Sequence, residues 1–281
     1  MVRFGRIVYN LTGIMSNRGL VKNSNKIGEA VCDKMKASDG KITPAEIEKI
    51  ITDTIGKKGA KRIKIVDSTD EAKKYALEHG NISAEEFDNM YGQILGFACG
   101  DKYKREAILH VKSIDDSFYQ YFGHEYLADA ISHETQHAMS FSSGKFDLIK
   151  KFSKIPFVRK LIDKEEVLIR QLGIQDKYSS IQLLALGEDV LTPEKARELV
   201  QKVLKNGDDK NNLFTIKTLI KYYKDEIRSY TVGYEAHSKY LGQELPQAKS
   251  IIEMYEKLVM ALKQERVNIV KNKIKDFIGL G

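Results

Sequence analysis

The sequence predicts an α+β fold, in which a small mixed sheet and one central helix precede a larger helical C-terminal lobe. Segments 61–68 and 105–113 alternate apolar and polar residues, which is the pattern of half-buried strands. From residue 145 onward, every periodic segment instead repeats its apolar residues at the spacing of an amphipathic helix. The change of period near Gly144 therefore separates a mixed region from a helical one.

Residues 1–58 are expected to form an N-terminal helical segment. Thr43 followed by Pro44 is a helix start signal, because the threonine side chain can cap the helix and proline suits its first position. This segment ends where the alternating pattern of the first strand begins.

Residues 59–144 are expected to form an α/β lobe. Between its two strands, residues 70–80 have helical spacing and end at Gly80, a common helix stop. A second helix, at about 126–141, follows the second strand and ends in Ser-Ser-Gly. This helix contains the residues on which the functional prediction depends.

Residues 145–281 are expected to form the helical lobe. Its helices are predicted at about 145–170, from Thr192-Pro193 to about 204, at 213–241, and from about Pro246 into the C-terminal tail. The segment 145–164 is both basic and apolar, and it is expected to cover a cleft, with contact to a membrane surface as the lesser alternative.

Composition excludes several classes of protein. The chain has 281 residues, 42% of them hydrophobic and 30% charged, which favours a folded chain over a disordered one. Cys32 and Cys99 could form at most one disulfide, so a reducing compartment is favoured. Without a long apolar run or a standard export signal, we expect a soluble, cytoplasmic protein.

The basic charge does not by itself predict a nucleic-acid partner. The net charge of +7 is a mild excess spread along the chain. The spacings of zinc fingers, RNA-recognition motifs and basic zippers are absent from the sequence. A peptide or protein substrate is therefore the expected partner, and the sequence does not predict an oligomeric state.

Residues 133–137 have the sequence His-Glu-Thr-Gln-His, an H-E-x-x-H motif in a segment with helical spacing. Positions i and i+4 lie on one face of a helix, so His133 and His137 can bind one metal ion. Glu134 projects further round the helix and can reach a water molecule on that metal. These residue types at this spacing predict zinc-assisted hydrolysis with Glu134 as general base and acid.

The motif and its surroundings resemble the zincin superfamily of H-E-x-x-H metallopeptidases. The resemblance covers about residues 60–144 and one later helix, and it implies that segment 105–113 is the edge strand facing the substrate. Metzincins continue their motif with a glycine and a third histidine, where this chain has Ser140 and Ser143, so that subclass is excluded. The resemblance to gluzincins instead implies a pattern in which a glutamate from a later helix is the third ligand.

Two glutamates of the predicted helix 213–241 fit that pattern, Glu226 and Glu235. The apolar and aromatic residues of this helix form one seam, which must face the rest of the protein. Projection at 100° per residue puts Glu226 about 70° and Glu235 about 130° from the centre of the seam. Glu226 is therefore the predicted ligand, with Glu235 as the alternative if the helix bends at Gly233.

Tyr230 and His237 lie near Glu226 on the same stripe of that helix. The resemblance to gluzincins implies that a tyrosine or histidine from this region donates a hydrogen bond to the oxyanion, and both residues are candidates. Core packing is the competing interpretation of a tyrosine-rich seam. The sequence thus predicts a Zn²⁺-dependent metallohydrolase, first of all a peptidase; the alternative is a non-catalytic zinc-containing binding or structural protein.

Overall fold

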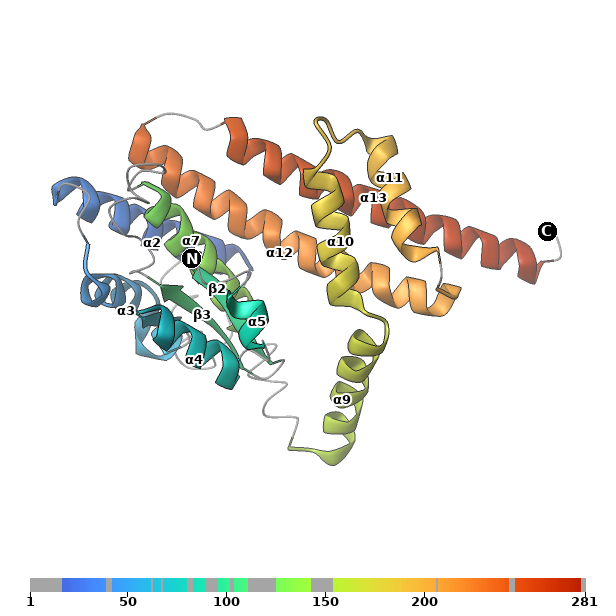
Figure 1. Cartoon of the computed structure of the whole chain (residues 1–281), viewed down its shortest axis with the longest axis horizontal. Coiled ribbons are helices and arrows are strands. Elements are labelled where there is room, and N and C mark those ends of the chain that lie inside the picture. The colour runs from blue at the N-terminus through green and yellow to red at the C-terminus, as the bar shows by residue number, and fades with distance from the viewer. Residues whose placement is uncertain are drawn as a thin grey trace. The chain divides into compact units, whose positions relative to one another are not determined.

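The computed structural model describes residues 17–38, 42–61, 63–66, 68–79, 83–88, 96–101, 104–110, 125–142, 154–205, 207–242 and 246–278. Parts of the expected helices 1–58 and 145–170 lie outside these ranges, as does the end of segment 105–113. In chain order the elements are α2 (Asn17–Ala37), α3 (Pro44–Ala60), β1 (Ile63–Val66), α4 (Thr69–His79), α5 (Ala84–Glu86), β2 (Gly96–Asp101), β3 (Lys104–His110), α7 (Glu125–Ser142), α9 (Pro156–Gln171), α10 (Ile174–Leu186), α11 (Pro193–Leu204), α12 (Asp209–Leu241) and α13 (Pro246–Phe277) (Figure 1).

The predicted α+β, zincin-like fold class is wrong, because the described chain is mostly helical. Its strands β1, β2 and β3 have only 4, 6 and 7 residues. By contrast, α12 and α13 alone have 33 and 32 residues. Alternation identified short strands correctly, but fold class depends on the share of the chain in each type of element, and long helices supply most of it.

The position of segment 105–113 also differs from the prediction of an edge strand. The strand order is β1-β3-β2, so β3 lies between the other two strands. It pairs in parallel with β1 and antiparallel with β2, and Ala107 is opposite both Ile63 and Ala98. Because neighbouring strands use both hydrogen-bonding edges of β3, this strand has no edge left for a substrate.

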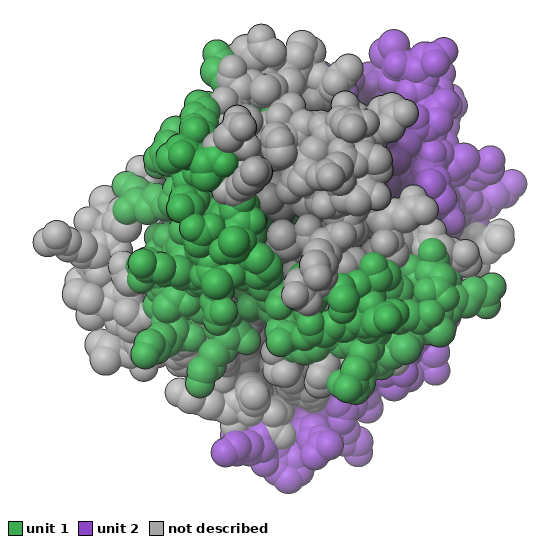
Figure 2. Space-filling model, turned by 60° about the vertical axis from the view of Figure 1, so that its left-hand side comes forward, with its two compact units in different colours: residues 1–152, 228–246 green, residues 153–227, 247–281 purple. Residues whose placement is uncertain are grey.

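The chain divides into two compact units, which are coloured separately in Figure 2. One consists of residues 1–152 and 228–246, and the other of residues 153–227 and 247–281. The sequence-based division into 1–58, 59–144 and 145–281 grouped residues by type of element. Contacts group them differently, because the last part of α12 joins the N-terminal unit.

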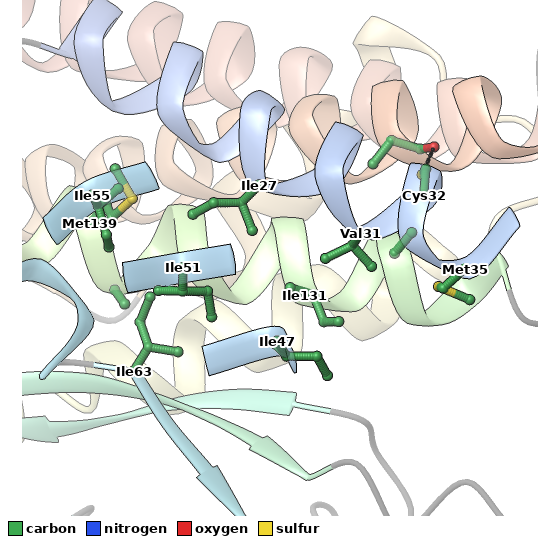
Figure 3. Packing of buried hydrophobic residues seen from close by; sticks show 13 residues of the cluster. Ile27, Val31, Cys32, Met35, Ile47, Ile51, Ile55, Ile63, Ile131 and Met139 are labelled. Carbon is green, nitrogen blue, oxygen red and sulfur yellow. Dashed lines mark hydrogen bonds between the residues drawn. The ribbon is translucent and has the colours of Figure 1, made fainter. Parts of the chain in front are cut away.

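The core of the N-terminal unit lies where α2, α3 and α7 meet β1 (Figure 3). Apolar side chains repeat every fourth residue on α2 and on α3, so each helix presents one stripe. The labelled residues, exposed by at most 7%, are Ile27, Val31, Cys32 and Met35 of α2, Ile47, Ile51 and Ile55 of α3, Ile63 of β1, and Ile131 and Met139 of α7.

The predicted start of α3 is confirmed. Thr43 is its N-cap and Pro44 its first residue, and Glu46 completes a capping box by binding back to the Thr43 backbone. The predicted cap of α11 is confirmed as well, since the Thr192 side chain accepts a hydrogen bond from the Lys195 backbone N–H.

Three helices, α2, α7 and the last part of α12, approach one another closely at Gly28. A Cβ atom at this position would overlap Ser132 Oγ of α7 and lie 2.7 Å from Ala236 Cβ of α12. Ser24 Oγ donates a buried hydrogen bond of 2.8 Å to Gln136 Oε1. These contacts set α7 against α12 and thereby position the residues described below.

The second unit contains α9, α10, α11, the first part of α12, and α13. Gly173 separates α9 from α10 with a φ of 55°, a left-handed conformation that suits glycine. Tyr223 of α12 is fully buried and stacks on Tyr178 of α10, with ring centroids 5.0 Å apart. None of the helices in the described ranges combines the length and apolar composition needed to cross a membrane.

Candidate metal centre

Helix α7 carries the H-E-x-x-H motif, and its observed span agrees with the predicted helix at 126–141. The helix buries Ala128, Ile131 and Ala138 on its apolar side. Both motif histidines are largely buried: His137 is 7% exposed, and the side chain of His133 is 13% exposed. The imidazoles are therefore largely shielded from solvent.

The two imidazoles converge on one point. His133 Nε2 and His137 Nε2 are 3.1 Å apart, and the rings meet edge to face with centroids 4.7 Å apart. Two nitrogen ligands of a tetrahedral Zn²⁺, each at 2.0–2.1 Å, are separated by about 3.3 Å. The observed separation is close to that value; it also suits a hydrogen bond between one protonated and one unprotonated ring nitrogen.

Glu226 completes a group of possible metal ligands. A carboxylate oxygen of Glu226 and one nitrogen of each histidine all lie within 4.8 Å of one another. The helix α12 is continuous from Asp209 to Leu241, so Glu226 has a fixed place one turn before Tyr230. Two imidazoles and one carboxylate, with a further position open, form the donor set of catalytic zinc sites, so these residues fit Zn²⁺.

Tyr178 of α10 orients the Glu226 carboxylate. Burial raises the pKa of the Tyr178 phenol well above its ordinary value, and the charge of Glu226 and a hydrogen bond to its side chain act in the same direction. The phenol thus stays protonated and donates to the carboxylate. Burial and the Glu226 charge also raise the pKa of neighbouring Tyr223.

The structure places Glu235 elsewhere. Its side chain is exposed and accepts a hydrogen bond from Asn25 Nδ2 of α2. Burial of part of the side chain raises the pKa of Glu235, although the Asn25 hydrogen bond opposes this. Since α12 passes through Gly233 as a single helix, Glu235 is not turned toward the histidines.

Glu134 lies beside the converging imidazoles. Its side chain is 12% exposed, and Oε1 is 3.9 Å from His133 Nε2. This distance is short enough for one water molecule to contact both the carboxylate and a metal held by His133. The position suits a base and does not require Glu134 to be a ligand.

The two candidate oxyanion donors have different surroundings. The ring of Tyr230 meets His133 edge to face, with centroids 4.5 Å apart. His237 is buried, and its Nδ1 lies 3.9 Å from Asp129 Oδ2, one turn before His133 on α7. Tyr230 therefore contacts a possible ligand directly, whereas His237 pairs with a carboxylate beside the site.

The sequence did not point to Asp129 or Tyr178, and it pointed to Gly233 only as a possible bend in the helix. A Cβ atom at Gly233 would overlap the Asp129 carboxylate and come within 3.3 Å of its backbone oxygen, so glycine allows this aspartate to lie against α12. Burial raises the pKa of Asp129 to about 7. Asp129 precedes His133 by four residues, a spacing that puts both on one face and could have identified it. Tyr178 is on another helix, and its separation from Glu226 in the sequence gives no indication that the two residues meet.

No protein-family model, curated protein or solved structure matches this chain. The interpretation of the centre therefore depends on its own residues and geometry.

Proposed function

We propose that the protein is a zinc-dependent metallohydrolase, with peptides or proteins as its substrates. The observation that carries the proposal is the convergence of His133, His137 and Glu226 beside the Glu134 carboxylate. Peptide bonds are the first choice of substrate because the H-E-x-x-H motif resembles that of zincin peptidases. The proposal depends on the motif and the ligand group rather than on the fold class.

Each residue has a distinct role in this proposal. His133, His137 and Glu226 would hold Zn²⁺, which when bound polarises a carbonyl and lowers the pKa of water. Glu134 accepts a proton from the attacking water at a carboxylate oxygen and passes it to the nitrogen of the leaving amine.

The surrounding residues orient these groups. Tyr178 holds the Glu226 carboxylate through its hydroxyl group. Tyr230 is the first candidate to donate a hydrogen bond to the substrate carbonyl oxygen, because its ring contacts His133. His237 is the second, with Asp129 fixing the ring from the Nδ1 side. A reducing compartment such as the cytoplasm is part of the proposal, because Cys32 is a buried free thiol.

The test separates metal binding from catalysis. Purified wild-type protein is expected to contain about one Zn²⁺ per chain and to cleave a mixture of fluorogenic peptides. Glu134→Gln is nearly isosteric; it should keep the zinc and lose about 100-fold or more of the cleavage rate. His137→Ala should lose the zinc, as measured by elemental analysis after gel filtration.

Glu235→Gln is the matched control, because it makes the same chemical change on an exposed carboxylate of α12. It should keep both zinc and activity. Undiminished cleavage by Glu134→Gln would reject the mechanism. Zinc at full occupancy in a wild-type protein without hydrolytic activity would instead support the non-catalytic zinc-binding alternative.

A further inference from the structure

The last turns of α13 carry two different apolar faces. Leu258, Leu262 and Ile269 are buried within the unit. Another set is exposed by 41–90%, and it consists of Val267, Val270, Ile274, Phe277 and Ile278. Every residue from 270 to 278 is exposed, and in Figure 1 the red end of α13 extends beyond α11 to the C-terminus. The exposed apolar set, here called the C-terminal stripe, therefore has no cover within the described chain.

The C-terminal stripe is a single face of the helix. At 100° per residue its five members lie within an arc of about 100°, centred about 130° from buried Ile269. Amphipathic helices of globular proteins normally bury one such arc and keep the opposite side polar. A second apolar arc on an exposed helix end indicates a surface that binds something outside this chain.

Basic residues border the stripe on both sides. Arg266 and Lys273 lie along one border, and Lys271 and Lys275 along the other; all four are exposed. The acidic residues of these turns, Glu265 and Asp276, instead project near Ile269, away from the stripe. The face thus combines an apolar centre with positive edges, and its complement is an apolar layer bordered by negative charge.

A second copy of the chain does not fit this pattern. The stripe has coiled-coil spacing, with Val267 and Ile274 at one core position and Val270 and Phe277 at the other. The flanking positions that would meet across a dimer hold Arg266, Lys271 and Lys273. In either helix orientation these positions would bring like charges together, which opposes pairing.

We propose that the C-terminal stripe binds the surface of membranes rich in anionic phospholipids. The helix lies in the plane of the interface, with its apolar residues among the acyl chains and its basic side chains at the headgroups. An anionic bilayer supplies the apolar layer and the negative border together, along the whole stripe.

The test is co-sedimentation of the full-length protein with sucrose-loaded vesicles. Vesicles of 30% phosphatidylserine in phosphatidylcholine should bind the protein at least about tenfold better than phosphatidylcholine alone, and added salt should weaken that binding. Lys271→Gln combined with Lys275→Gln should reduce binding by about 30-fold, because each lysine near an anionic surface contributes about tenfold or less.

Lys22→Gln combined with Lys26→Gln is the matched control. These lysines have the same four-residue spacing and are exposed on α2, so binding should stay at the wild-type level. Ile274→Ser combined with Phe277→Ser should abolish binding without lowering the melting temperature, since both side chains are exposed.

Four outcomes would overturn the proposal. The first is equal binding to both kinds of vesicle, and the second is no vesicle binding at all. The third is a concentration-dependent dimer, seen by light scattering, that Ile274→Ser with Phe277→Ser disrupts; a second copy of the chain would then be the occupant. The fourth is vesicle binding that the Lys271 and Lys275 substitutions leave unchanged, which would remove the charge argument.

Discussion

At the scale of the residue, Asp129 is a carboxyl group that the fold removes from water. Burial raises its pKa from 3.8 to about 7, and Gly233 provides the space for it against α12. Because the pKa is higher in the folded state, folding favours the protonated form. The associated stability is fully present below pH 4 and is lost as the pH rises through about 7.

Replacing Asp129 by asparagine should therefore change how stability depends on pH. In zinc-free protein, Asp129→Asn should gain stability relative to wild type as the pH rises from 4 to 8, by up to about 1.4 kcal/mol per pH unit. Urea unfolding at both pH values measures the difference. Asp276→Asn, on an exposed turn of α13, is the control and should show no such trend. If the difference in unfolding free energy between Asp129→Asn and wild type were the same at pH 4 and pH 8, the burial argument would be contradicted.

At the scale of the element, the contact of α2 with α7 and α12 depends on the absence of a side chain at Gly28. Ser132 Oγ can rotate away from an added methyl group, but Ala236 Cβ, at 2.7 Å, cannot. The backbone of α2 would have to move. Because α12 carries Tyr230 and Glu226, the same contact helps to set where those side chains lie relative to α7.

Gly28→Ala is expected to destabilise the protein by about 1–2 kcal/mol, because overpacking outweighs the better helix propensity of alanine. Gly187→Ala makes the identical change at the end of α10, where the nearest atoms are 3.6 Å from the added carbon. It should be neutral or stabilising by up to about 1 kcal/mol. Chemical denaturation of the two variants compares them directly. A neutral Gly28→Ala would show that the three helices can separate freely.

The sequence predicted the elements better than their packing. Local signals such as Thr43 with Pro44 fixed helix starts, and the i, i+4 spacing of His133 and His137 predicted their convergence. The buried face of α12 was not predictable in the same way. Periodicity assigned Tyr230, Tyr234 and His237 to the seam, and of these three only His237 is buried. The other buried residues after position 228 include Ser229, Val232, Gly233 and Ala236.

The physical reason is that closely packed helices bury their smallest residues and leave large aromatic rings at the borders. Hydrophobic period alone favours the large residues. The role of Tyr178 could not be predicted from the sequence for a related reason, because its contact with Glu226 depends on how α10 packs against α12. The predicted fold class overestimated the share of the chain in strands, because two alternating segments carry no information about the length of the helices that follow.

At the scale of the whole molecule, the proposed ligands come from distant parts of the chain. A metal that binds three such side chains binds the folded state far better than the unfolded one. Zinc should therefore stabilise the protein by about 2.7 kcal/mol at a free concentration 100 times its dissociation constant. For a chain of this size the melting temperature should rise by roughly 5–10 °C over that in chelator.

Alanine at each candidate glutamate decides which one takes part in that stabilisation. Glu226→Ala should lose most of the zinc-dependent rise in melting temperature, because a two-imidazole site binds weakly. Glu235→Ala should keep the rise, since Glu235 is exposed and bonded to Asn25. Scanning calorimetry with zinc and with chelator measures both. If the zinc-dependent rise in melting temperature were lost in Glu235→Ala and kept in Glu226→Ala, Glu235 rather than Glu226 would be the third ligand.

The hydrogen bond from Cys32 to the backbone of Ala236 spans 204 residues, and this separation matters during synthesis. A ribosome adds about 5–20 residues per second, so α2 leaves the exit tunnel roughly 10–40 s before the part of α12 that covers it. During that interval the nascent chain exposes the face of α2 around Gly28 and Cys32. Helix α2 therefore emerges early and is fully enclosed only late, and a chaperone that shields it on the ribosome would act before the proposed ligands can assemble.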